Sequence, residues 1–262
     1  MTRNRTDTPH HAPLPRPEEL LTGTDWASLE TPCGRGETLP GALARLLDTD
    51  PAVRAAAVGD ALRVVTHQNT VYEATVPVAL YVAAILNHPA TAAGESGRDG
   101  ERTSRYPTRA ALLDWLGDTA LDADDEVVAI AEGMWGGGFL DECPETRAFR
   151  DLRPAFYSAV RPLLGDDDAD VRDAAFVAAV PLVEHPALAS HRWELAEHAR
   201  RLLTTSTDRS RRDRALSALK TWGHDISALE NADDVAAREL RARRAAERQG
   251  WGTGGYSEDP PF

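Results

Sequence analysis

Hydrophobic residues recur along this chain with the spacing of α-helices, from about Leu39 to about Arg248. The clearest block has apolar residues at i, i+3, i+4, i+7, i+8, i+11 and i+12, namely Val171, Ala174, Ala175, Ala178, Ala179, Leu182 and Val183. That spacing places them on one face of a helix. Short Gly, Pro and Asp interruptions separate the blocks, and none alternates as a strand does. The pattern predicts an all-α protein.

Three of these blocks resemble one another. They read LLDTDPAVRAAAVGDALRVV from Leu46, LLGDDDADVRDAAFVAAVPLV from Leu163 and LLTTSTDRSRRDRALSALKTW from Leu202. An aspartate precedes an arginine by four positions in each, giving the pairs Asp50 with Arg54, Asp168 with Arg172, and Asp208 with Arg212. The arginines lie 118 and then 40 positions apart, or about three repeat lengths and one. The sequence therefore contains helical repeats.

Local signals predict where some of these helices begin. Asp50 followed by Pro51 predicts a cap and a proline at the first helical position, where its missing N–H is not needed. Thr70 and Glu73 have the spacing of a capping box ahead of an apolar helix. A polar turn is expected at residues 67–69, just before that box.

The repeated segments resemble HEAT repeats of the short bacterial type, in which L-L-x-D-x-D-x-x-V-R-x-x-A opens the second helix of each pair. Leu46 to Ala57 and Leu163 to Ala175 follow this pattern closely, whereas the third segment has Arg211 in place of the valine. The resemblance implies a right-handed α-solenoid (superhelix) of antiparallel, armadillo-like helix pairs. It also implies that the aspartates and arginines of the turns form a ladder between successive repeats. It carries no catalytic residue.

Composition suggests how the chain is organised. We expect a flexible N-terminal arm over residues 1–24, one repeat domain over 25–248, and a flexible tail over 249–262. Within the domain, a stretch rich in Gly and charge near 90–107 predicts an insertion loop. No apolar run is long enough to cross a bilayer, so a cytoplasmic protein is expected. The repeat count between residues 88 and 150 is left open.

The net charge of −13 bears on possible partners. Such a charge repels a phosphate backbone, so nucleic acid is a poor candidate and a basic protein a better one. Cys33 and Cys143 lie far apart without the spacing of a metal site, which favours two buried free thiols. We expect no metal and no cofactor.

One acidic stretch stands out, because ten acidic residues occur between Ala110 and Glu145 without a single Lys or Arg. Asp114, Asp118 and Asp122 recur every four residues, where like charges on one helix face cost stability unless they are compensated. The spacing does not match a Ca²⁺ loop. With two nearby aromatic residues, the predicted partner-binding set is Asp114, Asp118, Asp122, Asp124, Asp125, Glu126, Trp135, Phe139, Asp141 and Glu142. A solvated acidic face is the alternative interpretation.

These features predict a protein-binding function and no enzymatic activity. Bacterial HEAT-like proteins of this kind include immunity proteins that neutralise a cognate toxin, and a basic toxin would suit the acidic surface. A general adaptor or regulatory scaffold is the alternative. A HEAT-like DNA glycosylase is a weaker one, because it needs a basic groove, and the Arg-rich stretch from Arg200 to Arg214 is the single candidate wall.

Overall fold

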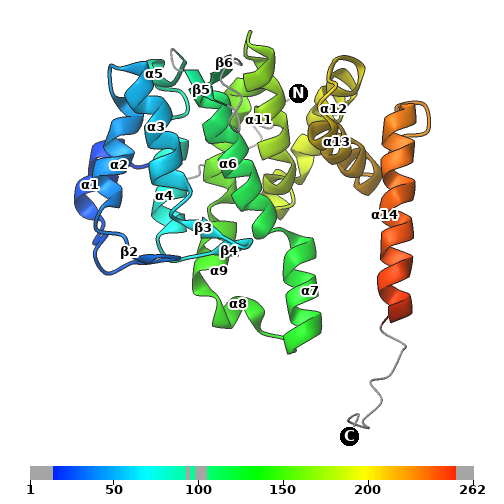
Figure 1. The fold of residues 1–262 in the computed structure, drawn as a ribbon, viewed down its shortest axis with the longest axis horizontal. Helices are drawn as coiled ribbons and strands as arrows, with labels where there is room; N and C mark the ends of the chain where they lie inside the picture. The colour runs from blue at the N-terminus through cyan, green and yellow to red at the C-terminus, as the bar shows by residue number, and fades with distance from the viewer. Residues whose placement is uncertain (1–13, 93–94, 98–104, 252–262) are drawn as a thin grey trace, which may run out of the picture. The chain divides into compact units, whose positions relative to one another are not determined.

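The computed structural model of the chain describes residues 14–92, 95–97 and 105–251, and most of them are helical (Figure 1). This confirms the all-α class. The α-helices are α1 (Pro17–Gly23), α2 (Leu39–Ala44), α3 (Pro51–Leu62), α4 (Thr75–Ile85), α5 (Pro89–Ala92), α6 (Thr108–Asp122), α7 (Asp125–Trp135), α8 (Phe139–Glu142), α9 (Pro144–Asp151), α10 (Arg153–Val160), α11 (Ala169–Leu182), α12 (Arg192–Thr205), α13 (Arg209–Thr221) and α14 (Ala232–Trp251). Three 3₁₀ helices are η1 (Arg45–Leu47), η2 (Arg161–Gly165) and η3 (Pro186–His191).

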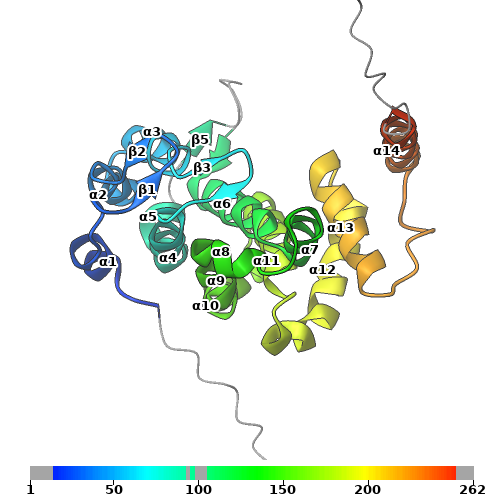
Figure 2. The same ribbon diagram turned by 90° about the horizontal axis from the view of Figure 1, so that it is seen from below.

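The chain divides into two compact units, whereas the sequence predicts one continuous repeat domain. Unit 1 ends at His198 and unit 2 begins at Ala199, so the division falls inside α12. In unit 1, α3, α6 and α11 pack in one row, and α1, α4 and α10 pack in a second. Figure 2 looks along these helices and shows α4 between α1 and α10. In unit 2, α13 packs against α14.

The helical face predicted from the hydrophobic spacing is the core of α11. All seven of its predicted apolar residues are buried, from Val171 to Val183. The equivalent face of α3 is less complete, because Ala57 and Ala61 are buried but Ala56 is exposed. Small side chains on α11 allow it to pack closely on α6, and the two helices run side by side in both views.

The N-terminal helix α1 corrects the predicted flexible arm. Residues 17–23 of the predicted arm are helical, and Leu20 is buried. The helix begins with Pro17 at its first position, and the backbone N–H of Arg16 donates to the Glu19 carboxylate at 3.2 Å. The rest of the predicted arm as far as residue 13, and the predicted tail from residue 252, lie outside the described residues.

Three short antiparallel hairpins precede helices of unit 1. They pair β1 (Glu30–Thr31) with β2 (Gly34–Arg35), β3 (Thr66–His67) with β4 (Thr70–Val71), and β5 (Glu95–Gly97) with β6 (Arg105–Pro107). The last pair falls within the predicted insertion loop near 90–107, of which residues 93–94 and 98–104 are not described. The predicted polar turn is the turn of the second hairpin, where Gln68 and Asn69 have φ of 51° and 58°.

The predicted capping box at Thr70 and Glu73 does not form. Thr70 belongs to β4, and Thr75 takes over at the start of α4: its hydroxyl donates to the carbonyl of Val65 at 2.6 Å and accepts from the N–H of Tyr72 at 2.9 Å. The Glu73 carboxylate instead accepts the N–H of Glu30 at 2.9 Å, which ties the first hairpin to the second. The capping box does not form because Thr70 pairs within the hairpin and α4 begins only at Thr75.

Gly117 provides a test of the contact between α6 and α11. A β-carbon at this position would lie 2.9 Å from the α-carbon of Ala178, and backbone cannot move aside as a flexible side chain can. Gly117→Ala should therefore lower the free energy of unfolding of unit 1 by about 1–3 kcal/mol, despite the better helix propensity of alanine. Urea denaturation followed by circular dichroism measures this change.

Gly133 in α7 is the matched control, because no atom lies within 4 Å of its added β-carbon. Gly133→Ala should raise stability by about 0.5–1 kcal/mol through helix propensity alone. If both variants stabilise the protein, the close approach of α6 and α11 is wrong.

Candidate interaction surface around helix α7

Helix α7 begins at an aspartate cap, directly after α6 (Figure 1). The Asp124 carboxylate accepts the N–H of Val127 at 2.7 Å, and Asp124 is 8% exposed. Asp125 and Glu126 follow in the first turn, where negative charge interacts favourably with the helix dipole. Asp124 of the predicted partner-binding set therefore stabilises the helix start.

The rest of α7 exposes more apolar surface than it buries. Its buried residues are Val128 and Ala131. Ile130 is 55% exposed and Met134 is 69% exposed. With the half-buried Val127, they occupy positions i, i+3 and i+7 and so share one flank of the helix. We call Val127, Ile130 and Met134 the α7 strip.

Two aromatic residues continue this surface beyond the end of α7. Trp135 is 70% exposed, and its ring stacks on that of Phe139 at 6.1 Å between centroids. Between them the chain turns through Gly136 and Gly138, whose φ values of 90° and 105° favour glycine. The two predicted aromatic residues are thus brought together, and this glycine turn allows Phe139 to fold back toward Trp135.

The structure separates the predicted acidic residues into two groups. In the first, the carboxylate has a partner within the chain: Asp114 accepts a hydrogen bond from the hydroxyl of Tyr106, and Asp141 pairs with Arg147. Asp118 and Asp122, on α6, also take part in interactions of this kind. The charge of Asp141 is therefore balanced by Arg147 within the chain, and the Asp114 carboxylate is hydrogen-bonded by Tyr106.

The second group consists of exposed carboxylates on α7 and α8 that have no ion pair or hydrogen bond among the described residues. They are Glu126, Glu132 and Glu142. Glu126 and Glu142 belong to the predicted partner-binding set. Glu132 is one of the ten acidic residues between Ala110 and Glu145 but is not in that set. We refer to these three residues as the unpaired glutamates. Residues 125–142 contain no Lys or Arg, so the surface is acidic around an apolar strip.

Two arginines hold the start of α7, and sequence reasoning missed both. Arg150 donates to the carbonyl of Ala123 at 2.6 Å and pairs with Asp125 at 2.5 Å. Arg153, only 2% exposed, donates to the same carbonyl at 2.7 Å and lies 3.3 Å from the Glu184 carboxylate. The N–H of Asp125 donates to Glu184 at 3.0 Å. The network joins the start of α7 to α9, α10 and the segment just after α11.

Charge and burial act in opposite directions on the pKa values of this network. Burial disfavours the ionised form of Asp125, but hydrogen bonding and charge from Arg150 and Arg153 outweigh it and lower its pKa. Burial raises the pKa of Glu184 and lowers that of Arg153. The structure thus explains the shifts by packing and pairing, without a catalytic role.

The repeated Asp and Arg residues form a recurring local turn. Asp50, Asp168 and Asp208 each cap the helix that follows, α3, α11 and α13, by accepting a backbone N–H of its first turn. Four residues later, each arginine donates to backbone carbonyls of the preceding turn: Arg54 to Asp48 and Thr49, Arg172 to Asp166 and Asp167, and Arg212 to Ser206.

An acceptor side chain two residues before each cap completes this turn. The side chains of Asp48, Asp166 and Ser206 accept the N–H groups of Asp50, Asp168 and Asp208 at 2.8, 3.0 and 3.2 Å. The predicted residues are therefore structural within each repeat. The ladder between successive repeats stays a prediction.

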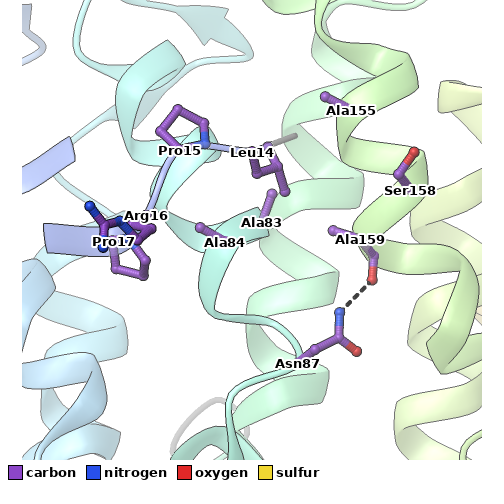
Figure 3. Close-up of a pocket in the computed structure, with 10 residues that line it drawn as sticks. All are labelled: Leu14, Pro15, Arg16, Pro17, Ala83, Ala84, Asn87, Ala155, Ser158 and Ala159. Atoms are coloured by element: carbon purple, nitrogen blue, oxygen red, sulfur yellow. Dashed lines mark hydrogen bonds between the residues drawn. The ribbon is translucent and has the colours of Figure 1, made fainter. Parts of the chain in front are cut away.

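A shallow hollow of about 380 Å³ lies in unit 1 between α4, α10 and the segment from Leu14 to Pro17 (Figure 3). Alanines from both helices form much of its wall, and the Asn87 side chain donates to the carbonyl of Ala159 at 2.9 Å. Arg16 is the one charged residue in the lining, and it pairs with Glu19. The Ser158 hydroxyl in the lining donates to the carbonyl of Pro154 at 2.9 Å, and no His, Asp or Glu among the described residues lines the hollow to activate it.

Other kinds of site find no support in the described part of the chain. Across residues 14–92, 95–97 and 105–251, no group of three or more His, Cys, Asp or Glu could hold a metal ion. None of the helices there is both long and apolar enough to cross a membrane. Cys33 and Cys143 are free thiols, as the sequence predicts, but the prediction that they are buried is wrong, because Cys33 is exposed and Cys143 is half-buried. No protein-family model, curated protein or solved structure matches this chain.

Proposed function

We propose that this protein is a non-catalytic, HEAT-like helical repeat protein, with the α-solenoid architecture of that class, that binds a basic protein through the surface around α7. The observation that carries the proposal is the exposure of Ile130, Met134 and Trp135 on a helix that also exposes the unpaired carboxylates of Glu126 and Glu132. Exposed apolar surface rimmed by polar residues marks interaction sites. Aromatic residues are frequent anchors of such sites.

The recurring turn supports the repeat architecture. Three segments far apart in sequence use the same cap and the same arginine-to-carbonyl bonds. Stacked repeats present extended surfaces and bind other macromolecules in many unrelated roles. The exposed surface therefore supports a protein-binding function, and the recurring turn supports the repeat architecture.

Neutralisation of a basic toxin in the cytoplasm is the specific form of this function that the charge favours. A basic toxin would supply the cations that the acidic surface lacks. A general adaptor would use the same surface with a different basic partner. The DNA glycosylase alternative is less well supported, because two arginines of its candidate wall, Arg211 and Arg212, are only 6% and 5% exposed, although Arg201 and Arg209 are exposed.

Affinity capture from lysate of the source cells tests the proposal. The bait variant Glu126→Lys/Glu132→Lys/Glu142→Lys reverses the unpaired glutamates, which are exposed and therefore not required for folding. The control variant Glu18→Lys/Glu37→Lys/Asp167→Lys changes the net charge equally at three exposed acidic residues away from α7. We expect wild type and control to capture the same basic protein and the α7 variant to lose it.

Reconstitution with the captured protein then measures the loss directly. The dissociation constant of the captured protein should be at least about tenfold higher for the α7 variant than for wild type. The difference should shrink in high salt, which screens the charges. A partner that binds both triple variants equally places the site elsewhere. If neither wild type nor either triple variant captures a basic protein, the proposed function is wrong.

A further inference from the structure

We infer that the part of the partner seated on α7 is an amphipathic helix whose apolar stripe is flanked by Lys or Arg. This inference rests on the proposed function and specifies the structure of the bound element. Its first basis is the shape of the exposed surface. Val127, Ile130 and Met134 form a single row along one flank of α7, about 10 Å or two helical turns long.

A row of side chains at this spacing fits the groove between rows on another helix. An extended strand needs free backbone groups, and the backbone of α7 is hydrogen-bonded within the helix. Recognition at α7 therefore proceeds through side chains, and the apolar surface of the bound element must repeat every three or four residues.

The second basis is charge. Glu126 lies one turn before Ile130 and so borders the strip, whereas Glu132, three residues after Ala129, lies on the other flank of α7, and Glu142 lies on α8. All three are exposed and unpaired among the described residues, and residues 125–142 contain no Lys or Arg. Two copies of this chain meeting through α7 would bring like charges together as their apolar strips made contact, which opposes self-association. A helix with Lys or Arg beside its apolar stripe matches both the strip and the Glu126 carboxylate that borders it.

The third basis is that α7 is held in place before any partner arrives. Asp124 caps its first turn, and Arg150 and Arg153 fix the residues on either side of that cap. A preformed helix does not lose backbone freedom on binding, which favours a short contact of this size. Trp135 and Phe139 extend the apolar surface beyond the strip.

Calorimetric titration of the full chain with three synthetic 18-residue peptides tests the inference. One peptide is a Leu/Lys sequence with helical amphipathic spacing, the second is its scrambled form, and the third replaces each Lys by Glu. We expect the first to bind wild type with a dissociation constant on the order of 1–100 μM, as suits a small interface. The other two should bind at least about tenfold more weakly.

Variants of the strip locate the contact. Ile130→Ser/Met134→Ser shortens two exposed side chains, so folding is retained. It should raise the dissociation constant of the first peptide at least about tenfold. Ala129→Ser, an exposed position on the opposite flank of α7, should leave binding unchanged. Circular dichroism of the mixture should show helix gained by the peptide.

The outcomes distinguish this inference from the proposed function. Equal binding of the amphipathic and scrambled peptides overturns the helical element but leaves a basic partner in place. If the strip variant and wild type bind the first peptide equally, the α7 strip is not the binding site. Failure of both cationic peptides to bind at 1 mM, on the order of the weakest useful contact, overturns the inference. Failure of the wild-type chain to capture any basic protein from lysate overturns the proposed function.

Discussion

Arg212→Ala should lower the free energy of unfolding of unit 2 by about 3–5 kcal/mol, because it leaves a buried carboxylate without its cation. The Arg212 guanidinium reaches the Asp234 carboxylate at 2.6 Å, and the two side chains are 6% and 5% exposed. It also donates to the carbonyls of Leu203 at 2.5 Å and Leu229 at 3.2 Å. One side chain thus connects α12, α13 and the start of α14.

Unit 2 has little else to offset this loss. Its buried apolar residues are few, and Asp234 is itself part of the cap of α14, where it accepts the N–H of Asn231 at 2.9 Å. A loss of this size is comparable with the total stability of a small unit. Hydrogen exchange with mass spectrometry, read over residues 199–251, separates unit 2 from unit 1.

Arg241→Ala is the matched control for this prediction. Arg241 is 54% exposed and pairs with Asp213 at 2.5 Å, so its removal should cost less than about 1 kcal/mol. Similar losses in both variants would show that the Arg212 side chain does not hold unit 2 together.

The same pair predicts how unit 2 responds to acid. Hydrogen bonding from Arg212 lowers the pKa of Asp234 below its ordinary value of 3.8. A group with a lowered pKa in the folded state stabilises the protein above its unfolded pKa and loses that contribution as the pH falls through the folded value. The protection factors of residues 199–251, which correct for the pH dependence of intrinsic exchange, should therefore fall below about pH 4, and Asp234→Asn should reduce that dependence.

Sequence spacing predicted the cap at Asp50 and the buried face of α11, whereas the caps at Asp168 and Asp208 were not predicted and the capping box at Thr70 does not form. The caps at Asp50, Asp168 and Asp208 form because the acceptor and the N–H lie two or three residues apart. The buried face of α11 follows from helical periodicity alone. Spacing alone does not reveal that the arginines bind main-chain carbonyls of the preceding turn.

The candidate site was only partly predictable, because its charges are balanced by residues distant in sequence. A run without Lys or Arg suggested ten comparable acidic residues, but Arg150 and Arg153 reach Asp125 from 25 and 28 positions away. Whether a carboxylate is paired depends on how the helices pack. The residues near it in the sequence do not show which distant arginine will reach it. The exposure of Ile130 and Met134 is likewise a tertiary property, since the same residues at the same spacing would be core in a covered helix.

Arg153→Met should lower the stability of unit 1 by about 2–3 kcal/mol and loosen the start of α7. The substitution retains apolar volume but removes the donor to the carbonyl of Ala123 and the positive charge beside Glu184. Burial already raises the pKa of Glu184, and loss of the cation makes its charge more costly. Hydrogen exchange over residues 123–131 and urea denaturation measure the two effects.

Two further variants separate the network from a general effect of losing an arginine. Arg147→Met removes an exposed pair with Asp141, so its stability should lie within about 0.5 kcal/mol of wild type. Arg153→Met/Glu184→Gln should regain part of the loss, because the remaining partner no longer carries a charge. If Arg153→Met leaves exchange over residues 123–131 unchanged, α7 is held by its cap and its two buried side chains alone, and the surface around it does not depend on the buried arginine.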